Sequence, residues 1–101
     1  MNEPQGINMN IPEQINILGL TYTIKDYEPI DFGERIYGLI DNNEQTITLD
    51  KTMSQEKREQ VFIHEFVHGA LWQLQQNEHA DDEVLVQGLA IAIHQLVKSL
   101  T

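Results

Sequence analysis

Cysteine is absent from the 101 residues of this chain. Its absence excludes disulfides, thiolate zinc sites, iron–sulfur clusters and a cysteine nucleophile. A domain this small without disulfides relies on its hydrophobic core, a metal ion or a partner for stability. The length also excludes a second domain that would bind a separate cofactor.

Basic residues are scarce: six Lys and Arg stand against 16 Asp and Glu, which gives a formal net charge of −10. A strongly acidic surface repels phosphate backbones and anionic lipid headgroups. We therefore expect no binding to nucleic acid or membranes, and we expect partners that are basic peptides or basic faces of proteins.

Long apolar runs are also missing. The longest, Leu89–Ile93, is too short to span a bilayer. Residues 1–10 have neither the basic segment nor the apolar segment of a signal peptide. These features predict a soluble protein of the cytoplasm, and they leave its oligomeric state open.

The first half of the chain has the pattern of short strands. Residues 1–13 are rich in Asn, Gln and Pro and predict a flexible N-terminal arm, so that residues 14–101 form a single domain. Residues 15–24 and 37–49 alternate β-branched or aromatic residues with polar ones, and residues 41–44 have the composition of a hairpin turn. We predict three or four antiparallel strands, with a loop over residues 28–33.

The second half has helical periodicity. Thr52 or Ser54 can cap a helix whose apolar residues recur at helical spacing from Ile63 to Leu74. A second helix begins near residue 83 and carries an apolar stripe formed by Leu85, Leu89, Ala92, Ile93, Leu96 and Leu100. The fold predicted from both halves is α+β: a small antiparallel β-sheet packed on two C-terminal helices.

One motif carries chemistry. Residues 64–68 are His-Glu-Phe-Val-His, and in a chain with only four His roughly 0.015 such HExxH motifs are expected by chance. On a helix, His64 and His68 lie one turn apart and about 40° around the axis, so their imidazoles can bind one metal ion. Glu65 points about 100° away from His64, where it can take a proton from a water activated by the metal.

With this motif, the sequence resembles the ImmA/IrrE-type zinc metallopeptidases, especially the short phage-encoded members. The resemblance rests on a hairpin over residues 38–49 that ends in Ile-Thr-Leu, on the segment HEFVHGAL from His64, and on Leu89-Ala90 in the second helix. It implies a minimal zincin-like core, a Zn²⁺ cofactor, and peptide-bond hydrolysis of a regulatory protein of a phage or mobile element in the host cytoplasm.

The resemblance also implies that the third zinc ligand is a carboxylate of the following helix, as in gluzincin-like enzymes. Glu78, Asp81, Asp82 and Glu83 are the acids in that region. On a helical wheel, Glu83 lies at the edge of the apolar stripe, whereas Asp82 lies near its middle. We predict Glu83 as the ligand and keep Asp82 as the alternative. Because an acid beyond a long first helix would be too distant, that helix must end early or the next must begin near Asn77.

The prediction from sequence is thus a zinc metallopeptidase in which His64, His68 and Glu83 bind zinc and Glu65 is the general base. Its substrate is a basic or extended peptide segment, added as a strand to an edge strand at Gln45–Leu49. Tyr22, Tyr27 and Tyr37 are candidates for stabilising the oxyanion. Two alternatives remain: a non-catalytic protein-interaction module stabilised by zinc, and an interaction module without metal.

Overall fold

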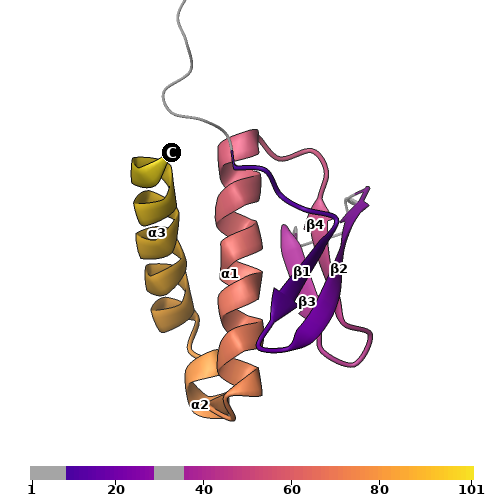
Figure 1. Ribbon diagram of the computed structural model, residues 1–101, viewed down its shortest axis with the longest axis vertical. Coiled ribbons are helices and arrows are strands. Elements are labelled where there is room, and N and C mark those ends of the chain that lie inside the picture. Colours follow the sequence, from indigo (N-terminus) through magenta and orange to yellow (C-terminus); the bar gives the residue numbers. More distant parts are fainter. Residues whose placement is uncertain (1–8, 29–35) are drawn as a thin grey trace, which may run out of the picture.

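Four strands form one sheet, and three helices follow them along the chain (Figure 1). The computed structural model describes residues 9–28 and 36–101. The strands are β1 (Gln14–Ile17), β2 (Leu20–Tyr27), β3 (Gly38–Asp41) and β4 (Thr46–Asp50). The helices are α1 (Gln55–Gln73), α2 (Asn77–Ala80) and α3 (Glu83–Leu100). The α+β fold with C-terminal helices is confirmed, while residues 1–8 of the predicted arm and 29–33 of the predicted loop lie outside the described residues.

The predicted hairpin at residues 41–44 is present, and a second hairpin joins β1 to β2. Each has a turn that its residues favour. Leu18 and Gly19 join β1 to β2 with φ angles of 49° and 97°, the left-handed pair that a two-residue hairpin turn requires. Between β3 and β4, the Asp41 side chain accepts hydrogen bonds from the N–H groups of Asn43 and Glu44, both at 2.9 Å. Local sequence is therefore sufficient to specify these two turns.

The sheet is mixed, so the prediction of a wholly antiparallel sheet is wrong. The strand order is β1-β2-β4-β3, and β2 pairs with β4 in parallel. Strand β4 carries Ile47 and Leu49, both 0% exposed, and a strand this apolar buries most area in the centre of the sheet. The central place of β4 also corrects the prediction that Gln45–Leu49 is an edge, because the edges are β1 and β3.

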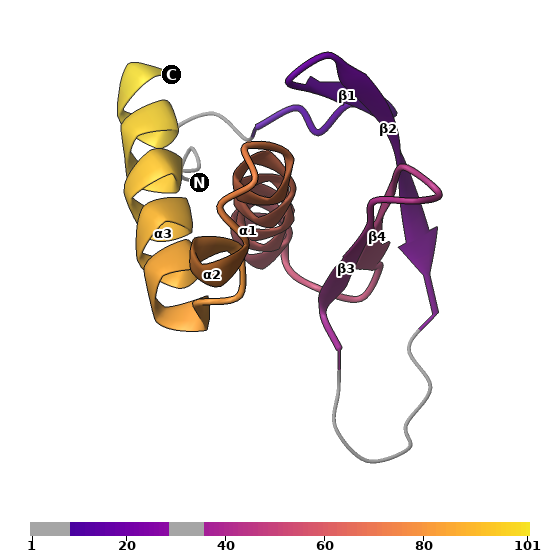
Figure 2. The same cartoon turned by 90° about the horizontal axis from the view of Figure 1, so that it is seen from below.

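Helix α1 lies between the sheet and α3 (Figure 2). Of the two predicted caps, Ser54 is the one that caps it, accepting a hydrogen bond from the N–H of Lys57 at 3.2 Å. A Cβ on Gly69 would lie 2.7 Å from Cδ1 of Ile40, so glycine allows α1 to pack closely on the sheet. The core is formed by Ile17, Tyr22, Ile47, Leu49, Phe62, Ile63, Val67, Val86 and Ala90.

The face of α3 that packs on α1 is not the apolar stripe predicted from sequence. Its buried residues are Val86, Ala90 and His94, whereas most of the predicted stripe is exposed. The small side chains of Val86 and Ala90 allow α3 to approach α1, and His94 pairs with a carboxylate of α1. By length and composition alone, α3 could also cross a membrane, and little of it is buried in this fold.

A buried carboxylate joins three distant parts of the chain. Glu59 of α1 is 0% exposed. Its Oε1 accepts hydrogen bonds from His94 Nε2 at 2.8 Å and Lys98 Nζ at 3.2 Å. Its Oε2 accepts from the N–H of Met9 at 2.9 Å and from Gln55 Nε2 at 3.0 Å. Glu59 thus anchors residue 9 and the end of α3 to α1, and this contact explains why His94 is buried.

Acid should destabilise the fold through Glu59. Burial raises the pKa of this carboxyl, but hydrogen bonds from His94, Gln55, Met9 and Lys98 outweigh it and lower the pKa from 4.5 to about 2. A depressed pKa stabilises the folded state above pH 4.5, and this contribution is lost as the pH falls from 4.5 toward 2. The shift corresponds to about 3 kcal/mol of the free energy of unfolding.

Urea unfolding at several pH values, with Glu59→Gln for comparison, measures this contribution. Glutamine keeps the size of the side chain but cannot ionise, so the variant should be less stable at pH 6. The difference between the two proteins should shrink as the pH approaches 2. A difference that stays constant across this range would show that ionised Glu59 does not stabilise the fold.

Candidate metal centre

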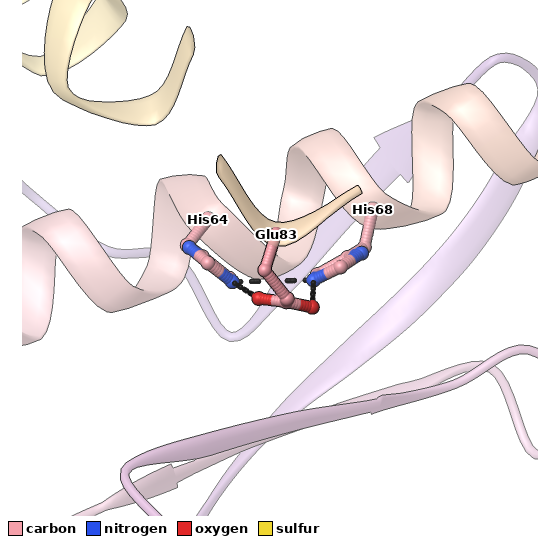
Figure 3. Close-up of side chains that lie close together, drawn as sticks. All are labelled: His64, His68 and Glu83. Atoms are coloured by element: carbon pink, nitrogen blue, oxygen red, sulfur yellow. Dashed lines mark hydrogen bonds and ion pairs between the residues drawn. The ribbon is translucent and has the colours of Figure 1, made fainter. Parts of the chain in front are cut away.

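Two imidazoles of α1 face the same point. His64 and His68 lie one turn apart, and their Nε2 atoms are 3.2 Å from each other (Figure 3). Their ring centroids are 4.8 Å apart, with the rings steeply inclined to each other. Each side chain is 18% exposed. The helical spacing of the motif thus places both ring nitrogens at one partly open position, as its sequence predicts.

The carboxylate of Glu83, the first residue of α3, completes the group. Its Oε1 lies 3.1 Å from His64 Nε2, and its Oε2 lies 3.0 Å from His68 Nε2 (Figure 3). Ligands about 2.1 Å from a tetrahedral zinc ion stand roughly 3.4 Å from one another. The three side chains therefore approach the spacing of a tetrahedral site, and two imidazoles with one carboxylate are a donor set that suits zinc.

The second nitrogen of each imidazole is held by an oxygen. His68 Nδ1 donates to the backbone carbonyl of Ala80 at 2.6 Å, and His64 Nδ1 donates to Gln87 Oε1 at 2.7 Å. With the Nδ1 protons placed in this way, neutral rings present their Nε2 lone pairs to the Glu83 carboxylate. The two Nε2 atoms and the Glu83 carboxylate are then acceptors directed at one point, where together they can bind a metal ion.

Short α2 explains how an acid of the second long helix reaches the histidines. Helix α1 ends at Gln73, and Gln75 adopts a φ of 62°, which turns the chain back. Helix α2 then begins at Asn77, which was one of the two alternatives predicted from the sequence. Asp82 is the N-cap of α3 and accepts a hydrogen bond from the N–H of Leu85 at 3.1 Å. The structure thus places Glu83 beside the histidines and gives Asp82 a capping role.

Glu65 lies beside the three-residue group and is not part of it. It is 8% exposed, and burial raises the pKa of its carboxyl, an effect that His64 and His68 oppose and Glu83 reinforces. Gly38 lets β3 lie close to α1 beside Glu65, because a Cβ there would lie only 2.5 Å from Val61 Cγ1 and 3.3 Å from Glu65 Cγ. A carboxylate in this place, with its proton affinity raised, is suited to accept a proton.

A cleft of about 420 Å³ opens over these residues. It is lined by Tyr37, Gly38, Leu39, Lys57, Gln60, Val61, His64, Glu65, His68, Glu83 and Gln87. The first three come from β3 and the residue before it, so the strand at the cleft is β3 and not Gln45–Leu49. The backbone carbonyl of Tyr37 bonds to Asp50 of β4. Since backbone groups alternate along a strand, those of Gly38 and Ile40 point to the open edge.

Among the three tyrosines considered for the oxyanion, Tyr37 alone lines the cleft. Tyr22 is fully buried, and its hydroxyl donates to Asn42 Oδ1 at 2.8 Å. Lys57 Nζ lies 4.4 Å from the centroid of the Tyr37 ring, so a positive charge also stands at this end of the cleft. Tyr37 therefore remains a candidate donor to the oxyanion.

Two groups that hold the histidines were not predicted from the sequence. Gln87 follows Glu83 by four residues on α3, so helical spacing alone places it on the same face, and this signal was available. No sequence pattern indicates the carbonyl of Ala80, because it reaches His68 only through the turn that α2 makes. His79, which lies in α2, is exposed and stays outside the group.

Comparison of the chain with protein-family models, with curated proteins and with solved structures found no match.

Proposed function

We propose that this protein is a zinc-dependent peptidase of the ImmA/IrrE type that its motif resembles. The observation that carries the proposal is the group formed by His64, His68 and Glu83, whose ligand atoms all lie within 4.8 Å of one another. A buried carboxylate stands next to this group, and a cleft gives access to both. A structural zinc site is normally closed by four protein ligands, whereas three ligands facing a cleft are typical of catalysis.

Each residue of the site has a separate role in the proposed hydrolysis. His64, His68 and Glu83 would hold the ion, with Gln87 and the Ala80 carbonyl fixing the imidazoles. A bound zinc ion supplies Lewis acidity to the scissile carbonyl and to the attacking water. Glu65 accepts the proton of that water and passes it to the leaving amine.

The substrate would lie along the free edge of β3. An extended peptide can pair with the backbone groups of Gly38 and Ile40, which brings its scissile bond over the cleft. A net charge of −10 favours basic segments. The proposed substrate is therefore an extended, basic segment of a peptide or protein.

Elemental analysis of protein purified without chelator, followed by peptide digestion, tests this function. We expect about one zinc ion per chain, since two imidazoles and one carboxylate suit zinc among the common divalent metals. We also expect cleavage of basic, extended peptides, detected by mass spectrometry, that stops with a chelator and returns with added zinc. Protein that folds and cleaves fully without metal would refute the proposal.

The second candidate is a protein-interaction module in which zinc is structural. The observation that favours it is the position of the group, which joins α1 to the first residue of α3. A zinc ion there would fasten the two helices in a small domain that has no disulfide. If chelation unfolds the chain and no peptide is cleaved, this candidate replaces the peptidase.

A further inference from the structure

Helix α3 exposes an apolar stripe along most of its length. Its members recur at helical spacing on a face that lies about 110° around the helix axis from Val86, Ala90 and His94, which pack on α1. They are Leu85 (37% exposed), Leu89 (40%), Ile93 (38%), Leu96 (59%) and Leu100 (77%), with exposed Ala92 among them. We call these six residues the α3 stripe. None of them is ionisable, so the stripe differs sharply from the acidic surface as a whole.

All six residues of the α3 stripe are exposed. Among the described elements, α3 contacts only α1 and α2, and it forms the outer layer on the side of α1 opposite the sheet (Figure 2). At about 100° per residue, the centre of the stripe lies roughly half a turn from Gln87, which lines the cleft. A partner on the stripe therefore does not block the cleft, and the stripe has no role in the proposed catalysis.

We propose that the α3 stripe binds a second copy of this chain, with the two α3 helices antiparallel about a two-fold axis. The stripe matches itself in this orientation. An axis midway between Ala92 and Ile93 places Leu89 of one copy opposite Leu96 of the other. The same axis places Leu85 opposite Leu100, and the small Ala92 opposite the larger Ile93. A stripe that pairs with itself in this way forms an isologous interface.

Charge also selects the antiparallel pairing. The acids Asp81, Asp82 and Glu83 stand at the N-terminal end of the stripe, and all three are exposed. A parallel pair would bring the two acidic ends together. An antiparallel pair separates them by the length of the stripe, about 22 Å, which is well beyond the screening length of about 8 Å at physiological ionic strength. The helix dipoles are then opposed, which is favourable.

The size of the stripe is sufficient for a weak dimer. Ala92, the small member of the stripe, allows the two helix backbones to approach closely next to the axis. Two stripes in contact remove on the order of 1,000 Å² from solvent, the lower bound for a specific interface. We therefore expect a dimer that dissociates on dilution.

Sedimentation equilibrium of the full chain over a range of concentrations and salt tests the pairing. The mass should rise from that of one 11.6 kDa chain toward twice this value with concentration. Because each copy carries a charge of −10, added salt should strengthen the dimer. Association driven by attraction between opposite charges would instead weaken as salt is added.

Lysine substitutions locate the interface. Leu89→Lys should raise the dissociation constant by about a hundredfold or more, because it removes two buried leucines per dimer and buries two charges. It also reduces the negative charge of the chain, so a loss of pairing cannot come from increased repulsion. Val84→Lys is the matched control, since Val84 is 84% exposed on the same helix but lies outside the stripe. It should pair as the wild type does.

A pair of opposite charges across the axis tests the two-fold register of the dimer. Leu96→Glu alone should also dissociate the dimer. The double variant Leu89→Lys/Leu96→Glu places opposite charges across the axis twice and should recover at least tenfold of the lost affinity. A far-ultraviolet spectrum and zinc content equal to wild type confirm that each variant is folded.

Three results would overturn the proposal. The first is a protein that stays monomeric at every concentration and salt tested. The second is a dimer that Leu89→Lys leaves intact. The third is flotation of the wild type, and not of Leu89→Lys, with vesicles of neutral phosphatidylcholine, which would assign the stripe to a membrane. All three are independent of whether the protein cleaves peptides.

Discussion

Glu65→Gln should remove most turnover while zinc stays bound. Glutamine keeps the shape of the side chain in its buried place beside Gly38, but it cannot accept a proton. Loss of a general base typically lowers the rate by about 10²–10⁴-fold. The measurement is kcat/KM on a verified peptide substrate, together with zinc content and thermal unfolding, both of which should change little.

Glu56→Gln is the matched control for this variant. Glu56 lies in the first turn of the same helix and is exposed, so its replacement should leave turnover unchanged. Equal cleavage of a verified substrate by the wild type and Glu65→Gln would show that the peptidase mechanism is wrong for this protein. Loss of zinc in Glu65→Gln would instead make Glu65 a ligand, against its position outside the three-residue group.

Removing any one of the three ligands should weaken zinc binding by about a hundred- to a thousandfold. All ligands of a structural zinc site together contribute roughly 10–16 kcal/mol of binding free energy, so each ligand accounts for a few kcal/mol. The variants are His64→Ala, His68→Ala and Glu83→Ala, and competition with a fluorescent zinc chelator measures the affinity of each. Apo and zinc-loaded wild type should differ in melting temperature, and this difference should shrink in the variants.

Asp82→Ala separates the two acids that the sequence left open. Asp82 caps α3, so its loss should cost about 1 kcal/mol of stability and leave the zinc affinity close to wild type. His79→Ala should likewise keep zinc. If Asp82→Ala loses zinc and Glu83→Ala retains it, the assignment of the third ligand is reversed. Full zinc occupancy in the double variant His64→Ala/His68→Ala would reject the site altogether.

The parts of this fold that follow from local sequence were predictable. The turns at Leu18-Gly19 and after Asp41 and the cap at Ser54 each depend on residues within about four positions of one another. The same holds for the two histidines, because spacing of i and i+4 sets their relation on any helix. These features can therefore be predicted without knowing which residues pack against them.

The position of Glu83 was predicted on an argument that was only partly right. The helical wheel put Glu83 at the edge of the apolar stripe, and beyond that edge lie Val86, Ala90 and His94, which pack on α1. The apolar stripe, predicted as the buried face of the helix, is exposed in the structure. That Glu83 binds metal stays a prediction until the zinc experiments are done.

Sequence by itself determined the helix that bears His64 and His68, its cap and the two hairpins, because each is stabilised by contacts between near neighbours in the chain. Tertiary structure decided that β4 lies in the centre, that α3 packs through Val86 and Ala90, and that Gln87 and the Ala80 carbonyl hold the imidazoles. These depend on contacts between residues far apart in sequence. Periodicity shows that a helix has an apolar face, but the buried face is chosen by the fit and the polar pairs of the opposing surface.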